Sequence, residues 1–310
     1  MDQNFPKVSV VIPAYNRPLL LQRAIQSVLN QSYRNIEIIV VDDASTEAIF
    51  PTLNTFSQFN IKYAKHPQNK GLAASRNTGS KMAEGEFINF LDDDDELDPS
   101  KIEKQMNIFL NSSPNLGLVY CGYRYVFKNK IIIEGKPRHR GHILKYALND
   151  SLTIVTHCAL IRKEHLLSIG GFDEQLMSAE DFDFWIRFAK FFEYDYVPET
   201  LVTYHLHESG NMTRQLQNRI HVREIIMQKY KNDLIQNKQA LSVHLCRLGA
   251  LYYMAGDRRK SRHYIYQSIL VWPFHWKGYV YFLLMILDFL KKGTLEHFGT
   301  LNYGGNKCYY

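Results

Sequence analysis

The sequence predicts an α/β protein: a mixed, mainly parallel sheet flanked by helices, followed by an all-helical C-terminal extension. Two observations lead to this fold class. From Val8 to about Thr203, short apolar β-branched runs alternate with helical patterns, which is typical of a sheet covered by helices. From residue 215 onward the strand signal is absent and apolar residues recur at helical spacing. We therefore divide the chain into residues 1–214 and 215–310.

The first elements are predicted from their patterns in chain order. Val8–Ile12 is a strand, and Leu19–Asn30 is a helix with its apolar residues on one stripe. Ile36–Val41 is almost wholly apolar, as expected of a buried parallel strand. Ala73–Ala83 is a helix that ends at Gly85.

The later elements continue the alternation. Phe87–Leu91 is predicted to be a strand, and Pro99–Leu110 a helix with Pro99 near its first turn. Leu118–Phe127 and Tyr196–His205 are predicted as further strands, and Ala179–Phe191 as a helix. This order of elements supports one sheet with helices on both faces.

The C-terminal extension combines basic and aromatic residues. Gly256 and Asp257 predict the end of one helix and the N-cap of the next. The basic cluster Arg258–Arg262 precedes an aromatic-rich helix pair that contains Trp272 and Trp276. Such a surface suits anionic lipid head groups, and it equally suits packing on the first domain or on a partner subunit. Both interpretations stay open.

Composition excludes several classes of protein. The 310 residues are 45% hydrophobic and 22% charged, which argues for a globular chain and against disorder. The net charge of +6 suits an anionic small molecule or an acidic membrane surface without demanding nucleic acid. Four widely spaced cysteines form neither a zinc pattern nor a disulfide framework. With no signal peptide at Met1–Lys7 and no long apolar run, we expect a cytoplasmic protein, either free or peripheral on the inner face of the membrane.

Acidic and polar residues follow three of the predicted strands. These are Pro13–Asn16, Asp42–Ser45 and Asp92–Asp95. In an open α/β sheet, ligands bind beyond the carboxyl ends of the strands. Clustered carboxylates repel one another unless a cation compensates them, and Mg²⁺ or Mn²⁺ prefers such oxygen ligands together with phosphates. An Asp-x-Asp at a strand end therefore suits a metal-bound diphosphate. For Asp95, Glu96 and Asp98, the alternative is that they cap a helix or lie in a solvated turn.

Four segments in this order resemble a glycosyltransferase of family 2 with the GT-A fold. They are Val8–Ser45, Asn69–Asn77, Glu84–Asp95, and Gly170–Asp173 followed by Glu180-Asp181. The resemblance spans roughly residues 7–210. It implies transfer of a sugar from a nucleotide diphosphate donor with inversion, with Mn²⁺ or Mg²⁺ as cofactor.

The resemblance also implies roles for individual residues. The nucleotide-sugar site would comprise Pro13, Ala14, Tyr15, Asp42, Asp43, Lys70, Gly71, Arg76, Asp92 and Asp93. In it, the Tyr15 ring is available for stacking on the base and Asp43 accepts a hydrogen bond from it. Asp92 faces the ribose or the sugar of the donor, and Asp94 contacts the metal.

The same resemblance assigns the reaction to the helix that begins near Ala179. Asp181 matches the position of the catalytic base, with Asp183 as the alternative. His207 is the nearer match to a histidine that binds the metal or the pyrophosphate, while His205 stands where the family has arginine. We expect Trp185, His66 and His157 to be structural.

Competing classes fail on specific features. No Gly-x-Gly-x-x-Gly follows the first strand and no P-loop is present. A response-regulator receiver, or a phosphatase with Asp-x-Asp on its first strand, would place its acids elsewhere. A catalytically inactive nucleotide-sugar-binding module is the remaining alternative. We expect a UDP-sugar donor, a saccharide or lipid-linked acceptor in cell-surface polysaccharide or glycolipid synthesis, and no nucleic acid; homo-oligomerisation and membrane contact stay open.

Overall fold

The computed structural model describes residues 5–152, 154–176, 179–206 and 216–290. The chain forms two compact units. The first comprises Met1–Ile143 with Thr153–His207, and the second comprises Leu144–Leu152 with Glu208–Tyr310. Each is described by itself below, and the domain boundary expected after residue 214 stays a prediction.

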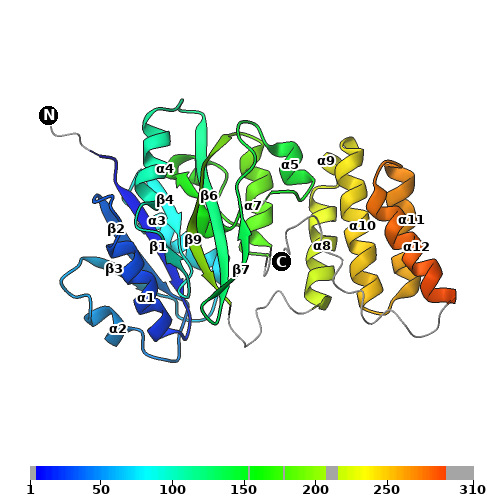
Figure 1. Ribbon diagram of the computed structural model, residues 1–310. Coiled ribbons are helices and arrows are strands. Elements are labelled where there is room, and N and C mark those ends of the chain that lie inside the picture. Colours follow the sequence, from blue (N-terminus) through cyan, green and yellow to red (C-terminus); the bar gives the residue numbers. More distant parts are fainter. Residues whose placement is uncertain (1–4, 153, 177–178, 207–215, 291–310) are drawn as a thin grey trace. The chain divides into compact units, whose positions relative to one another are not determined.

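The first unit is built on a sheet whose leading strands are parallel. β1 (Val8–Ala14) lies between β2 (Ile36–Asp42) and β4 (Phe87–Phe90), and β3 (Ile61–Lys65) lies beyond β2. All of these pairings are parallel. The carboxyl ends of β1, β2 and β4 therefore meet at one edge of the sheet, as the sequence predicts (Figure 1).

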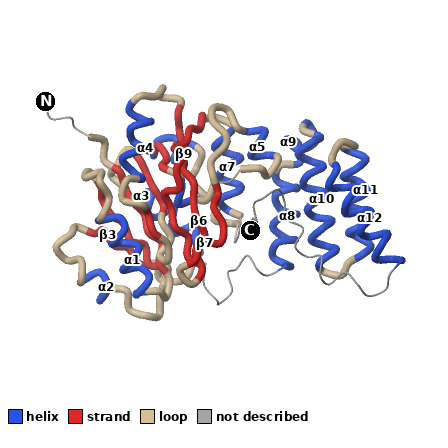
Figure 2. The backbone as a smooth tube through the Cα atoms, viewed as in Figure 1, coloured by secondary structure: helices blue, strands red, loops and turns tan. Residues whose placement is uncertain are grey.

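The other half of the sheet is mixed, and it contains strands that the sequence analysis missed. β8 (Leu160–Arg162) runs antiparallel to β4 and to β6 (Leu116–Phe127). β6 then pairs in parallel with β9 (Glu193–His205), which pairs with the short β5 (Glu96–Leu97). β7 (Lys130–Gly135) forms a hairpin with β6. The α/β fold class is confirmed (Figure 2).

Helices flank this sheet. They are α1 (Pro18–Leu29), α2 (Phe50–Asn54), α3 (Leu72–Met82), α4 (Lys101–Leu110), α6 (Lys163–Ser168) and α7 (Glu180–Ala189), with a 3₁₀ turn, η1, at Thr156–Cys158. The predicted helix Pro99–Leu110 is present, but it begins two residues later than predicted, so Pro99 lies just before its first turn. Asp98 Oδ1 accepts hydrogen bonds from Ser100 N and Oγ at 3.0 and 2.8 Å, so a side-chain turn occupies this stretch and the helix begins at Lys101.

Helix α3 lies very close to β1. A Cβ atom added at Gly79 would stand 2.2 Å from Val11 Cγ1, so only glycine permits this approach. This close approach holds the C-terminal half of α3 against β1.

The second unit is helical in the part that the structure describes. It contains α5 (Leu144–Leu148), α8 (Leu216–Lys229), α9 (Lys231–Gln236), α10 (Lys238–Met254), α11 (Arg258–Val271) and α12 (Trp276–Leu290). Ile220, Leu248, Leu251 and Tyr252 form a buried apolar cluster. Asp257 caps α11 by accepting from Lys260 N at 2.9 Å, and Gly256 has φ 82°, so the predicted stop and cap are confirmed.

Polar contacts explain why Leu144–Leu152 belongs to this unit. Asp150 accepts from Arg223 Nη1 at 2.8 Å and also pairs with Arg247. The buried His244 contacts Leu148 O at 2.8 Å. This short segment is therefore held by side chains of α8 and α10.

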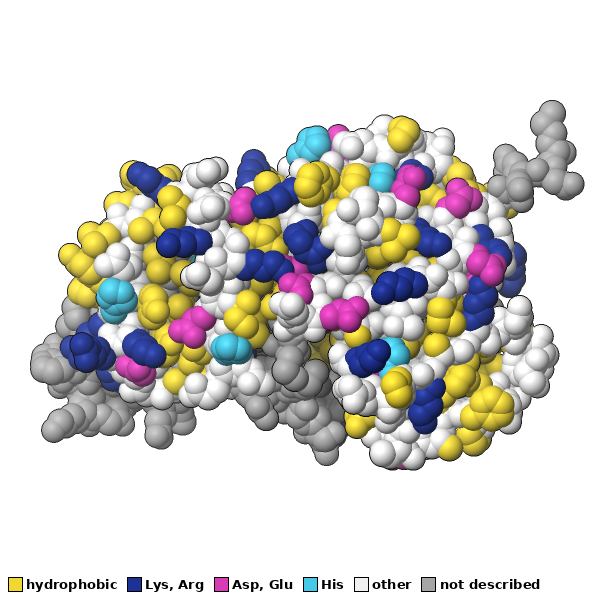
Figure 3. Space-filling view, turned by 180° about the vertical axis from the view of Figure 1, so that it is seen from behind, with side chains coloured by type: hydrophobic (Ala, Val, Ile, Leu, Met, Phe, Trp, Pro, Cys, Tyr) yellow, Lys and Arg dark blue, Asp and Glu magenta, His cyan; other side chains and the backbone are white. Residues whose placement is uncertain are grey.

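The surface of α11 and α12 carries exposed aromatic and apolar residues. The most exposed are Phe274, Trp276, Leu283, Leu270 and Tyr266. Basic and hydrophobic side chains are interspersed over the helical unit in the face that Figure 3 shows. Among the described residues, no helix is both long enough and apolar enough to cross a bilayer.

Candidate active site

Asp42 ends β2 and is used to hold its own loop. Its Oδ1 accepts from Ser45 N at 2.7 Å, and its Oδ2 accepts from Tyr63 O–H at 2.9 Å. Burial alone would raise the pKa of Asp42, but the hydrogen bonds from Ser45 and Tyr63 outweigh burial and lower it. The side chain is thus a fixed anion beneath the edge of the sheet.

Asp43 joins the β2 loop to the start of α3. It accepts from the backbone N–H groups of Lys70 and Gly71, both at 2.8 Å, and His66 Nδ1 lies 2.7 Å away. Gly71 has φ 87°, a backbone conformation that favours glycine. The structure therefore brings together three residues of the predicted nucleotide site, and the predicted structural role of His66 fits its contacts.

The predicted base pocket lies at the end of β1. Pro13 and Ala14 are buried, and Pro13 lies beyond the part of β1 that pairs with β4, where its missing N–H leaves no gap in that ladder. Tyr15 is 45% exposed, so its ring is accessible for stacking. Its backbone N–H donates to Asp93 Oδ2 at 3.1 Å, which joins this loop to the acidic loop after β4.

Arg76 is a buried cation between two acidic side chains. From α3, its Nη1 donates to Glu180 Oε1 at 2.9 Å and its Nη2 donates to Asp92 Oδ1 at 3.1 Å. The guanidinium also lies over the Phe172 ring, 5.3 Å from its centroid. Arg76 thereby links the acidic loop to the first turn of α7.

Arg17 neutralises the middle of the acidic loop. Its Nη1 donates to Asp94 Oδ2 at 2.7 Å and to Asp93 Oδ1 at 3.2 Å. Burial and the charge of Asp94 raise the pKa of Asp93 to about 7, although Arg17 opposes this shift. The sequence analysis did not identify Arg17, because nothing in its local pattern indicates a contact across the sheet edge.

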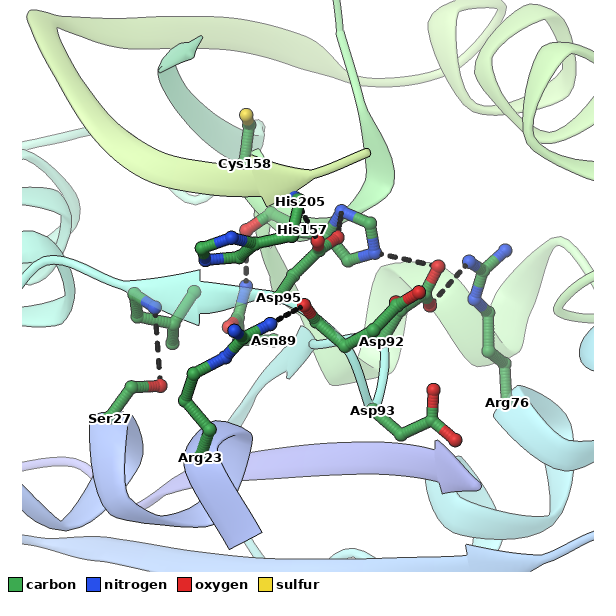
Figure 4. A network of polar contacts seen from close by, with 12 residues as sticks. Arg23, Ser27, Arg76, Asn89, Asp92, Asp93, Asp95, His157, Cys158 and His205 are labelled. Carbon is green, nitrogen blue, oxygen red and sulfur yellow. Dashed lines mark hydrogen bonds and ion pairs between the residues drawn. The ribbon is translucent and has the colours of Figure 1, made fainter. Parts of the chain in front are cut away.

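His157 was expected to be structural, but it lies inside the acidic cluster. Its Nε2 is 2.9 Å from Asp92 Oδ2 and its Nδ1 is 3.4 Å from Asp95 Oδ2. Figure 4 shows the ring between these carboxylates, with Arg76 on the other side of Asp92. Burial alone would raise the pKa of Asp92, but the charges of His157 and Arg76 hold it well below its usual range. Burial and the charges of Asp94 and Asp92 raise the pKa of Asp95.

The two candidate bases on α7 have different surroundings. Asp183 is fully buried and accepts from Arg187 Nε at 2.7 Å, while Arg187 also donates to the backbone oxygens of Ile169 and Gly171. Asp181 is half-buried beside Glu180. Burial and the charge of Glu180 raise the pKa of Asp181 to about 7.

The remaining predicted residues lie around this centre. His205 N donates to Asp95 Oδ1 at 2.9 Å, and its Nε2 lies 2.7 Å from Glu96 Oε1. Trp185 is buried, as predicted. His207 lies outside the described residues, so its metal role stays a prediction.

The chemistry of the acidic loop fits a divalent cation. Ligand atoms of Asp92, Asp95 and His157 all lie within 4.8 Å of one another. Asp95 Oδ2 and both ring nitrogens of His157 are buried without a hydrogen-bond partner, apart from the ion-pair contacts above. Carboxylate oxygens predominate, as Mg²⁺ and Mn²⁺ prefer.

Comparison with known proteins agrees with this geometry. The model for glycosyl transferase family 2 matches residues 9–170, more than half of the chain. The chain belongs to this family. An uncharacterised glycosyltransferase of Rickettsia typhi is 33% identical over 217 residues, which cover 67% of each chain. Another from Methanocaldococcus jannaschii is 30% identical over 218 residues, covering 68% of this glycosyltransferase and 74% of that relative.

Solved structures show the same fold. TarS of S. aureus (residues 1–349, in complex with UDP-GlcNAc) has a TM-score of 0.60 at 19% identity, covering 83% of this chain and 90% of that chain. The mannosyltransferase PcManGT of Pyrobaculum calidifontis, in complex with GDP-Man and Mn²⁺, has a TM-score of 0.56 at 18% identity, covering 94% and 89%. The glycosyltransferase therefore has the GT-A fold, which confirms the predicted fold, family and enzyme class.

Proposed function

We propose that this glycosyltransferase is metal-dependent and inverting, and that it moves a sugar from a UDP-sugar to a hydroxyl group of a saccharide or lipid-linked acceptor. One observation carries the proposal. The buried guanidinium of Arg76 contacts both Asp92 in the acidic loop and Glu180, the neighbour of Asp181. Arg76 therefore links the proposed donor-binding loop to the segment that carries the proposed base.

The donor's nucleoside would bind at the edge formed by β1, β2 and the start of α3. Tyr15 offers an exposed ring to the base, and the buried Pro13 and Ala14 next to it would line the base pocket. Asp43 holds the Lys70–Gly71 backbone in place. TarS binds UDP-GlcNAc and PcManGT binds GDP-Man, so a nucleotide-sugar donor is the chemistry of two proteins with this fold.

Asp94 is the proposed metal ligand at the donor's diphosphate, together with His207. Asp95 and His157 are enclosed, with side chains 0% and 2% exposed, whereas Asp94 and Asp92 are 13% and 22% exposed. A metal that bridges to a donor has to reach the diphosphate, which favours the more exposed carboxylates. When bound, the metal would neutralise the charge that grows on the leaving diphosphate.

Asp181 is the proposed general base. Its carboxylate takes the proton of the acceptor hydroxyl while that oxygen forms a bond to the anomeric carbon. In the same displacement, the bond from the anomeric carbon to the diphosphate oxygen breaks and the nucleoside diphosphate leaves. Attack from the face opposite the leaving group inverts the configuration. A pKa of about 7 for Asp181 is well matched to this task near neutral pH.

The decisive experiment combines binding and turnover. A thermal-shift panel of UDP, GDP and their sugars, with and without Mn²⁺, identifies the donor, because a ligand that binds the folded state raises the melting temperature. Transfer of the identified sugar, with the anomeric configuration of the product read by NMR, tests inversion. Donor binding with no transfer to any saccharide or lipid-linked acceptor would instead favour an inactive binding module.

A further inference from the structure

Arg17 differs from the other arginines that contact the acidic loop. Arg76 is buried, with its side chain 3% exposed. Arg23 donates from Nη2 to the backbone oxygen of Asp94 at 2.5 Å and pairs with Glu96. Arg17 is 46% exposed, and it contacts side-chain oxygens of Asp93 and Asp94 through a single nitrogen, Nη1. Arg17 is thus the cation whose side chain has the most freedom to leave.

The backbone that carries Arg17 is, in contrast, firmly held. Asn16 adopts φ 54°, and its N–H donates to Ser45 Oγ at 3.0 Å. The Asn16 Oδ1 atom accepts from the N–H groups of Thr46 and Glu47 at 2.8 and 3.1 Å. Arg17 O also accepts from Leu21 N in the first turn of α1. Any movement of Arg17 is therefore a swing of its side chain about a fixed Cα atom.

Arg17 occupies one of the two carboxylate oxygens of Asp94, the proposed metal ligand. Its Nη1 lies 2.7 Å from Asp94 Oδ2. A divalent cation bound to this oxygen would meet the guanidinium at a distance where like charges repel strongly. One of the two cations has to leave. Because the Arg17 backbone is fixed at the end of β1, a displaced guanidinium stays within reach of the same edge of the sheet.

We propose that Arg17 holds the Asp93–Asp94 pair in the metal-free enzyme, gives up Asp94 when the metal binds, and then binds the diphosphate of the donor. This inference rests on the proposed function, since it takes Asp94 as the metal ligand. A guanidinium suits both positions, because its planar donors match carboxylate and phosphate oxygens alike. When metal and nucleotide sugar are absent, Arg17 keeps a positive charge beside the acidic loop. When they are bound, Arg17 adds a contact to the diphosphate of the nucleotide sugar.

The test measures two affinities whose changes have opposite signs. We expect Mn²⁺ alone to bind roughly fivefold more tightly to Arg17→Gln than to the wild type, because the competing guanidinium is gone. Electron paramagnetic resonance of the free Mn²⁺ ion measures this affinity. At saturating Mn²⁺, UDP or GDP binds roughly tenfold more weakly in the same variant, because a charge-assisted contact is lost. A variant that merely misfolds would weaken both affinities.

Two further variants sharpen the result. Arg17→Lys keeps the charge but not the planar fork, so we expect Mn²⁺ affinity near that of the wild type and diphosphate affinity between the two. Arg34→Gln removes an exposed arginine just before β2, at the opposite end of that strand, and controls for net charge. It leaves both affinities unchanged.

The outcomes separate this inference from the proposed function. Equal Mn²⁺ affinities in wild type and Arg17→Gln, including no binding in either, would overturn the exchange. Unchanged diphosphate affinity would also overturn it, because Arg17 would then make no contact with the donor. Independently, Mn²⁺ binding that persists in Asp94→Asn would show that the proposed metal ligand is wrong, whatever the Arg17 variants do.

Discussion

Arg76 on α3 donates to Glu180 on α7 at 2.9 Å, across 104 residues of sequence. The same guanidinium reaches Asp92 at 3.1 Å, so one buried cation balances an acid from each of two predicted motifs. A buried pair of this kind is costly to break, since removal of one partner leaves the other charge uncompensated. Arg76 therefore couples the stability of the fold to the geometry of the proposed site.

Replacement of Arg76 by leucine should destabilise the protein by roughly 3 kcal/mol or more, because Asp92 and Glu180 lose their common partner. Urea denaturation measures the change in the free energy of unfolding. The double variant Arg76→Leu/Glu180→Gln should recover part of the loss, since one unpaired charge is removed. Arg259→Leu, at an exposed position on α11, is the matched control and should stay within about 0.5 kcal/mol of wild type. A similarly small effect of Arg76→Leu would contradict this account.

Asp181 and Asp183 should respond differently to the same change to asparagine. Asp181→Asn should lower kcat by roughly a hundredfold to ten-thousandfold and leave donor affinity intact, because it removes the base alone. Asp183→Asn should lower stability by roughly 3 kcal/mol, because Asp183 is the buried partner of Arg187. Steady-state kinetics, calorimetric donor binding and denaturation separate the two effects. Full turnover in Asp181→Asn would move the base elsewhere.

The pH profile of kcat/KM should show a loss of activity on the acid side of neutral pH. Because burial and Glu180 raise the pKa of Asp181 to about 7, its basic form is lost as the pH falls below 7. We expect kcat/KM to fall about tenfold per pH unit below that point and to level off above it. Asp93 also has a pKa raised to about 7, so Asp93→Asn serves as the control and should keep this loss of activity. A profile that stays flat down to pH 5 would contradict a raised pKa for the catalytic base.

The aromatic surface of α11 and α12 gives a separate prediction about membranes. If the helical unit binds an acidic bilayer, Phe274→Ser/Trp276→Ser should release the protein from vesicles that contain phosphatidylglycerol. Added salt should weaken binding of the wild type, because basic residues contribute to it. Phe50→Ser, at an exposed position on α2, is the control and should not change binding. Co-sedimentation measures all three, and equal binding by wild type and the double variant would reject this surface.

The sequence predicted the long apolar strands and the residues at their carboxyl ends better than the short strands and the tertiary contacts. Apolar strands such as Ile36–Asp42 have a strong periodic signal, and the acids that follow them mark their ends. β8 has only three residues and β7 is largely exposed, so neither has a pattern that distinguishes it from a loop. The pairing of Asp150 with Arg223 and Arg247 likewise depends on tertiary contacts that no local pattern encodes.

The site shows the same limit. Asp43 and Asp92 could be located because each follows a recognisable strand, and the roles of Asp43 and Asp181 came from the resemblance to the family. His157 could not be located in this way, since it enters the acidic cluster from a short 3₁₀ turn with no motif around it. The pKa of Asp181 was also undecided from sequence, because the helix N-terminus lowers it while burial and Glu180 raise it. The folded structure is needed to decide which effect is larger. Here burial and the charge of Glu180 are larger, and the pKa of Asp181 is raised.

The most direct test of the proposed mechanism is an anomalous-difference map from a crystal grown with UDP and Mn²⁺. We expect a manganese peak bonded to a carboxylate oxygen of Asp94 at about 2.2 Å and to the UDP diphosphate, with the uracil at Tyr15. A peak enclosed between Asp95 and His157 with no contact to the nucleotide, or UDP bound without manganese and away from Asp94, would contradict it.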